Sequence, residues 1–109
     1  MRAIYVKPGK RPVTVDIEDK LKILEEMVEG EMDVIYPFGD DPVAIICHAD
    51  GKDSGLKPNR ALRDGLGNPQ KLVFGSFLIV GMGKYRSLSE SFIKKYTELF
   101  KKPERFKEI

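Results

Sequence analysis

The segment most suggestive of binding starts at Lys57 and reads Lys-Pro-Asn-Arg-Ala-Leu-Arg-Asp. Arginine can form paired hydrogen bonds to phosphate or carboxylate, and asparagine can hold a backbone segment or a base edge. We therefore take Lys57, Asn59, Arg60 and Arg63 as candidate binding residues. The alternative is structural: Asn59 and Arg60 would tie a long loop to a sheet, with Leu62 in the core. The structural interpretation is the favoured one, and the binding interpretation stays open.

A glycine-rich turn is the second candidate site. The sequence Gly-Met-Gly-Lys-Tyr-Arg-Ser begins at Gly81 and lies between an apolar run and a helical pattern. Backbone amides and a helix N-terminus can hold a phosphate in such a turn, and Lys84 and Arg86 would add positive charge. The Walker spacing is absent, and a plain turn explains a lone Gly-x-Gly. Lys84 and Arg86 are therefore candidates for a phosphate or nucleotide site as a further alternative.

The single cysteine, Cys47, and the single histidine, His48, are adjacent in an apolar run that predicts a strand. Neighbours on a strand point to opposite faces, so this pair cannot form the hydrogen bond that a thiolate and its base require. One cysteine and one histidine also cannot build a zinc site of the usual kind. The aspartates match no calcium-binding loop. We expect no catalytic residue, no metal and no cofactor.

Charge is distributed unevenly along the chain. Residues 1–50 carry six Lys or Arg and eleven Asp or Glu, which gives −5, whereas residues 51–109 carry thirteen and six, which gives +7. A basic half can bind nucleic acid or an acidic partner. The total of +2 is small for a nucleic-acid-binding domain, so nucleic acid is the less favoured partner.

Periodicity predicts the elements that would position these residues. Alternating apolar and polar residues indicate strands at 2–7 and 12–17, and an apolar stripe indicates a helix over 17–28 that Gly30 ends in the left-handed conformation. Further strands are predicted at 32–36, 43–47 and 72–80. A long irregular segment is predicted at 54–69, with at most one short strand or turn of helix near 60–63. A second helix, capped by Ser87 or Ser89, is predicted at 87–102.

This order, β-β-α-β-β-loop-β-α, predicts one α+β domain over residues 1–109. We expect a mostly antiparallel sheet of about five strands with both helices packed on one face. No apolar run approaches the roughly 18 residues of a membrane span, so no membrane partner is expected. One unpaired cysteine and the lack of a signal-peptide core favour a cytoplasmic location. The oligomeric state is left undefined by the sequence.

Several blocks of the chain resemble a known family of small bacterial and phage proteins, the domain of unknown function 3846. The blocks are residues 4–9, 35–38, 41–47, 55–64 and 75–81. The resemblance implies a stand-alone module found in phages and integrated mobile elements, and it brings no activity. His48 stands where the family usually has asparagine, which weakens a catalytic role, and Glu29 stands where glycine is usual.

These observations together predict an accessory protein that binds another protein without catalysis. The first alternative is nucleic-acid binding through Lys57, Arg60, Arg63 and the basic C-terminal part. The second alternative is phosphate or nucleotide binding at the glycine-rich turn.

Overall fold

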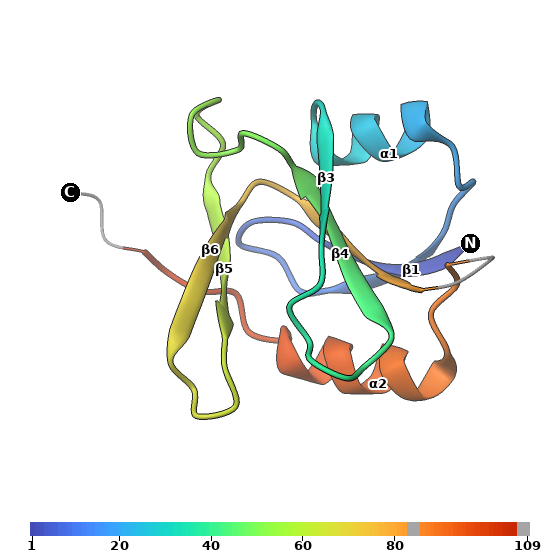
Figure 1. Ribbon diagram of the computed structural model, residues 1–109. Coiled ribbons are helices and arrows are strands. Elements are labelled where there is room, and N and C mark those ends of the chain that lie inside the picture. The colour runs from blue at the N-terminus through green and yellow to red at the C-terminus, as the bar shows by residue number, and fades with distance from the viewer. Residues whose placement is uncertain (83–85, 107–109) are drawn as a thin grey trace.

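The computed structural model describes residues 1–82 and 86–106 of the chain (Figure 1). Five strands form one antiparallel sheet in the order β2-β1-β7-β4-β3, and two strands form a separate hairpin, β5-β6. The α+β class and the five-stranded antiparallel sheet are confirmed. The elements are β1 Arg2–Val6, β2 Val13–Asp16, α1 Leu21–Val28, β3 Met32–Ile35, β4 Val43–His48, β5 Pro58–Arg63, β6 Pro69–Phe74, β7 Phe77–Gly81 and α2 Glu90–Leu99.

The two helices lie on opposite faces of the large sheet, as Figure 1 shows. Adjacent residues of the central strand β4, such as Ile45 and Ile46, are both fully buried and face opposite sides. α2 packs on the face of Ile45 through Tyr96, and α1 packs on the face of Ile46 through Leu24. The prediction that both helices pack on one face is therefore wrong. Continuous apolar runs in the central strands require cover on both sides.

The segment predicted to be mostly irregular contains β5, where one short strand or a turn of helix near 60–63 was expected, and the turn that leads into β6. β6 and β7 were expected as one strand, but the chain bends at Gly75, which has a φ of +84°. This φ favours glycine, and a Cβ here would also lie 2.6 Å from Cδ1 of Leu56, so the leucine side chain would have to shift. The bend turns β6 away from the large sheet, where it pairs with β5. Leu62 and Val73 of the hairpin join the core on the α2 side.

The left-handed residue after α1 is Glu29, with a φ of 68°, and not Gly30 as predicted. The N–H of Gly30 donates to the carbonyl of Glu25 at 2.9 Å, which closes the helix end. Gly30 has a different role: a Cβ there would lie 2.5 Å from Nε2 of His48, so glycine lets the imidazole ring pack against the helix end. The helix therefore ends with a glutamate in the left-handed conformation, followed by a glycine on which the His48 ring packs.

α2 is held at both ends of its buried face. Ser89 is the N-cap, and its Oγ accepts from the N–H of Phe92 at 3.4 Å. Asp41, in the β3–β4 loop, accepts from the Tyr96 hydroxyl and from the Lys95 ammonium, both at 2.5 Å. The ring of Tyr96 also packs on Phe38, with centroids 4.3 Å apart. These contacts fix the β3–β4 loop against the helix.

Replacing Glu29 by glycine should stabilise the protein, because a non-glycine residue in the left-handed region costs about 1–2 kcal/mol. We expect Glu29→Gly to raise the free energy of unfolding by about 1 kcal/mol, measured by urea denaturation. Glu26→Gly, inside the same helix, is the matched control and should lower the free energy of unfolding by about 1 kcal/mol. Destabilisation by both substitutions would contradict the assignment.

Stability at low pH should depend on Asp41. Hydrogen bonds, first from Lys95 and then from Tyr96, hold the pKa of Asp41 below its ordinary value. A carboxyl with a lowered folded-state pKa contributes stability above its unfolded pKa of about 3.9, and that stability is lost as the pH falls through the folded value. Asp41→Asn should therefore flatten the fall in stability below about pH 4. Urea denaturation at several pH values tests this, and the same steepness in wild type and variant would refute it.

Candidate functional site

Asn59 is fully buried and joins β5 to two other segments. Its amide donates to the carbonyl oxygens of Val6 and Gly75, both at 2.9 Å. Its Oδ1 accepts from Nη1 of Arg60 at 2.7 Å. Both polar ends of this side chain are therefore used inside the protein.

Arg60 is 1% exposed and is the largest fully buried side chain among the described residues. Its guanidinium donates to the Phe100 carbonyl from Nε at 3.3 Å and from Nη2 at 3.1 Å, and to the Lys10 carbonyl from Nη2 at 2.6 Å. Phe100 ends α2, where a cation is favoured by the helix dipole. Burial lowers the pKa of Arg60, and the negative charge of Glu104 opposes that effect. Arg60 and Asn59 thus tie β5 to the sheet and to α2, as the structural interpretation predicts.

The other candidate residues lie in separate places. Arg63 is exposed, and its Nη2 lies 3.1 Å from Oε1 of Glu104. Arg86 binds the Asp19 carboxylate with Nε at 2.9 Å and also with Nη2, and these hydrogen bonds lower the pKa of Asp19. Lys57 is exposed beside another cavity, and Lys84 lies outside the described residues. The candidates do not converge on one site.

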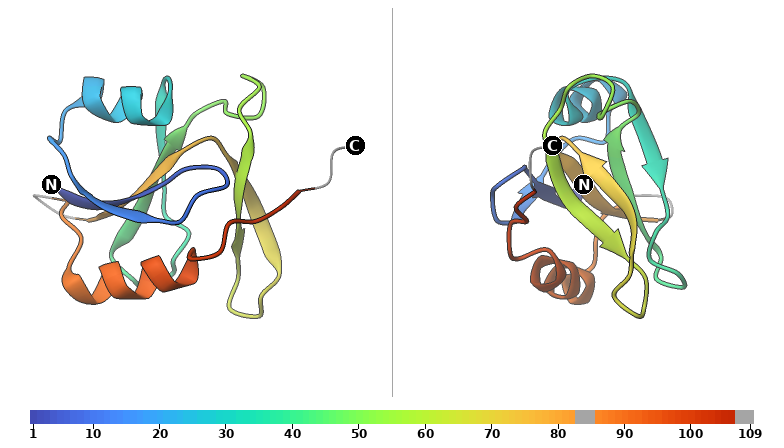
Figure 2. Two further views of the ribbon diagram at one scale, coloured as in Figure 1. Left: turned by 180° about the vertical axis from the view of Figure 1, so that it is seen from behind. Right: turned by 90° about the vertical axis from the view of Figure 1, so that its left-hand side faces the viewer.

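A groove of about 510 Å³ lies between the β5–β6 hairpin and the C-terminal end of α2, and we call it the hairpin groove. Figure 2 shows the turn of the hairpin projecting beside the helix end. The lining combines apolar residues with five charged ones; of the charged residues Arg60 is buried, and we call Arg63, Asp64, Lys102 and Glu104 the rim of the groove. The lining residues are Pro37, Phe38, Arg60, Ala61, Leu62, Arg63, Asp64, Gly65, Gly67, Leu99, Phe100, Lys102 and Glu104.

Two large apolar side chains, one lining this groove and one next to it, are exposed to solvent. Leu99, in the last turn of α2, is 61% exposed and lines it. Leu66, at the tip of the hairpin between two lining glycines, is 88% exposed. Sequence reasoning missed both residues. The available signals were a leucine isolated in a glycine turn, and adjacent Leu99 and Phe100, which cannot both face one narrow helix stripe.

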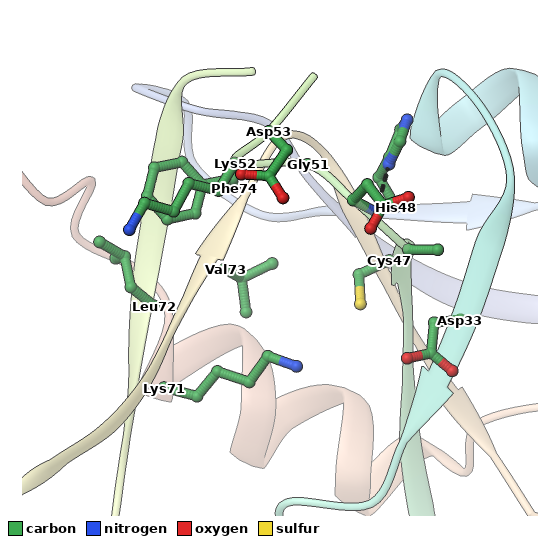
Figure 3. Close-up of a pocket in the computed structure, with 12 residues that line it drawn as sticks. Asp33, Cys47, His48, Gly51, Lys52, Asp53, Lys71, Leu72, Val73 and Phe74 are labelled. Carbon is green, nitrogen blue, oxygen red and sulfur yellow. Dashed lines mark hydrogen bonds between the residues drawn. The ribbon is translucent and has the colours of Figure 1, made fainter. Parts of the chain in front are cut away.

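A second cavity, of about 220 Å³, lies between β4 and β6 (Figure 3). Cys47 faces it and belongs to the core on the α2 side, whereas the His48 ring lies against Gly30 at the end of α1. Nδ1 of His48 accepts from the N–H of Asp50 at 2.9 Å. The prediction that Cys47 and His48 point apart is confirmed. Burial raises the pKa of the Cys47 thiol, which disfavours the reactive thiolate.

Within residues 1–82 and 86–106, no group of three or more His, Cys, Asp or Glu side chains is arranged to hold a metal ion. The helices in this part of the chain are too short and too polar to cross a membrane.

The family model described as Domain of unknown function (DUF3846) matches residues 1–101. The chain belongs to this family. The match includes both sheets and both helices of this DUF3846 protein, so the resemblance noted in the sequence is confirmed. No curated protein and no solved structure matches the chain.

If Arg60 is the tie between β5 and α2, its loss should cost far more than the loss of Arg63. Arg60→Ala leaves buried carbonyl oxygens without donors, each at about 1–3 kcal/mol, so we expect the free energy of unfolding to fall by about 3 kcal/mol or more. Arg63→Ala removes an exposed ion pair and should cost less than about 1 kcal/mol. Urea denaturation measures both, and equal small losses would contradict the role of Arg60.

Proposed function

We propose that this protein is a small accessory protein, of phage or mobile-element type, that binds a segment of another protein in the hairpin groove without catalysis. The observation that carries the proposal is the exposed side chain of Leu99 at the mouth of an apolar groove. Grooves that combine apolar walls with a few polar groups, and apolar side chains left in water around them, are typical of recognition sites.

The charges at the rim favour an acidic partner segment. The Asp64 carboxylate accepts the N–H groups of Leu66 and Asn68, both at 2.9 Å, and these bonds, that of Asn68 first, lower its pKa. The Glu104 carboxylate likewise accepts hydrogen bonds, from the N–H of Ala61 and from the guanidinium of Arg63. Lys102 has no ion-pair partner within the described part of the chain. The segment that complements this rim presents a large apolar side chain next to an aspartate or glutamate.

Protein binding has more support than the two alternatives. Arg60, one of the cations considered for nucleic acid, is buried, and Lys57 lines a different cavity from Arg63. Arg86 of the glycine-rich turn is bound to Asp19. Among the described residues, Arg60 is therefore buried, Lys57 and Arg63 are separated, and Arg86 is already paired.

A random-peptide display library, screened against the wild-type protein, tests the proposal. We expect selected peptides to contain a large apolar residue beside an acidic one. Leu99→Gln should weaken their binding roughly tenfold, because an apolar contact worth about 1.5 kcal/mol is lost. Leu21→Gln is the matched control, since Leu21 is 60% exposed on α1 and lies far from the groove in the fold. Its affinity should equal that of wild type.

Two results would contradict the proposal. One is a library that yields no enriched sequence, and the other is peptide binding that Leu99→Gln leaves unchanged. Binding of an oligonucleotide that weakens steeply with salt, unaffected by Leu99→Gln, would instead favour the nucleic-acid alternative.

A further inference from the structure

The C-terminal segment places a carboxylate against the outer edge of β5. Oε2 of Glu104 accepts from the N–H of Ala61 at 2.7 Å, and Oε1 accepts from Nη2 of Arg63 at 3.1 Å. An N–H that donates to Glu104 is not used in the ladder with β6, so it faces outward from the hairpin. We call the Ala61 N–H and the Arg63 guanidinium together the carboxylate cradle.

The cradle belongs to the hairpin groove, because Ala61, Arg63 and Glu104 all line it. Its two donors are held by β5, whereas the carboxylate comes from a segment that follows α2 and lies beyond the family match. The Glu104 side chain is 26% exposed, so water reaches it. A backbone N–H and a guanidinium on one carboxylate make charge-assisted hydrogen bonds, the strong kind in proteins.

The buried positive charge of Arg60 favours an anion in this cradle. Arg60 lies one residue from Ala61, and the negative charge of Glu104 counteracts the lowering of its pKa by burial. A cradle left empty would deprive Arg60 of that compensation and leave the Ala61 N–H with water in place of a charged acceptor. Exchange of one carboxylate for another avoids both costs.

We propose that the cradle is a recognition site for carboxylate groups, and that Glu104 occupies it in competition with an aspartate, glutamate or terminal carboxylate of a bound segment. The part of this inference that concerns a bound segment rests on the proposed function. The part that concerns the cradle itself does not.

Acetate is the probe for the cradle alone. In the full-length Glu104→Ala variant, we expect the Ala61 amide proton to move upfield in NMR spectra, and added acetate to return it downfield with saturation. Wild type, in which Glu104 competes for the cradle, should need about tenfold more acetate for the same response. Arg63→Gln combined with Glu104→Ala should abolish the response. If acetate shifts Ala61 equally in wild type and Glu104→Ala, or in neither, the inference is overturned.

Glu104→Gln provides a second variant, since it keeps an acceptor for Ala61 and removes the charge. Acetate should displace its side chain more readily than that of wild type, which gives an intermediate response. A Glu104→Gln spectrum that ignores acetate while Glu104→Ala is misfolded would count against the cradle.

An acidic peptide from the library probes the competition. If Glu104 fills the cradle about nine-tenths of the time, Glu104→Ala should bind such a peptide about tenfold more tightly. Glu26→Ala, which removes the same charge on the opposite face of the sheet, is the control and should bind as wild type does. Equal affinities of wild type and Glu104→Ala would refute the competition. A failed library screen contradicts the proposed function and leaves the acetate result to decide the cradle.

Discussion

The rest of this structure depends on one constraint: the guanidinium of Arg60 is buried away from water. The Arg60 side chain is 1% exposed, so its donors require acceptors from the protein at fixed positions. Those acceptors belong to the β1–β2 turn, to Asn59 and to the end of α2. Because each is a different segment, one charge orders the hairpin, the turn and the helix end together. Such a network is stable only while it is complete.

The hairpin groove is a result of this network. Its two walls are the hairpin and the last turn of α2, and both are bonded to Arg60. If the walls separated, the Arg60 guanidinium would lose its hydrogen bonds to the Phe100 carbonyl. Asn59 and Arg60, which the sequence singles out as candidate binding residues, therefore hold the groove in place. Apolar residues such as Leu99 and Phe38 line it.

The local sequence pattern was sufficient to predict the helices and strands that have regular periodicity. It failed to predict features that depend on packing between segments distant in the sequence. Alternation in β1 and the stripe in α1 are local, so these elements were predicted. β5 was predicted only as a short strand or a turn of helix near 60–63, because Asn59 and Arg60 are polar in a segment rich in glycine and proline, and only pairing with β6 and the core buries them. The helix positions were wrong because an apolar run does not tell how many layers cover a strand. The exposure of Leu99 depends on where α2 ends against the hairpin.

The position of β7 has a consequence for how the chain folds. β7 is the central strand of the large sheet, between β1 and β4, yet it is the last strand in the sequence. During synthesis β1–β2 and β3–β4 can form early as isolated pairs, and such pairs are only marginally stable in water. Insertion of β7 converts two weak halves into one sheet through contacts that are distant in sequence, which is a slow process. A ribosome that stalls before this strand would therefore hold a nascent chain with exposed apolar surfaces, a substrate for chaperones.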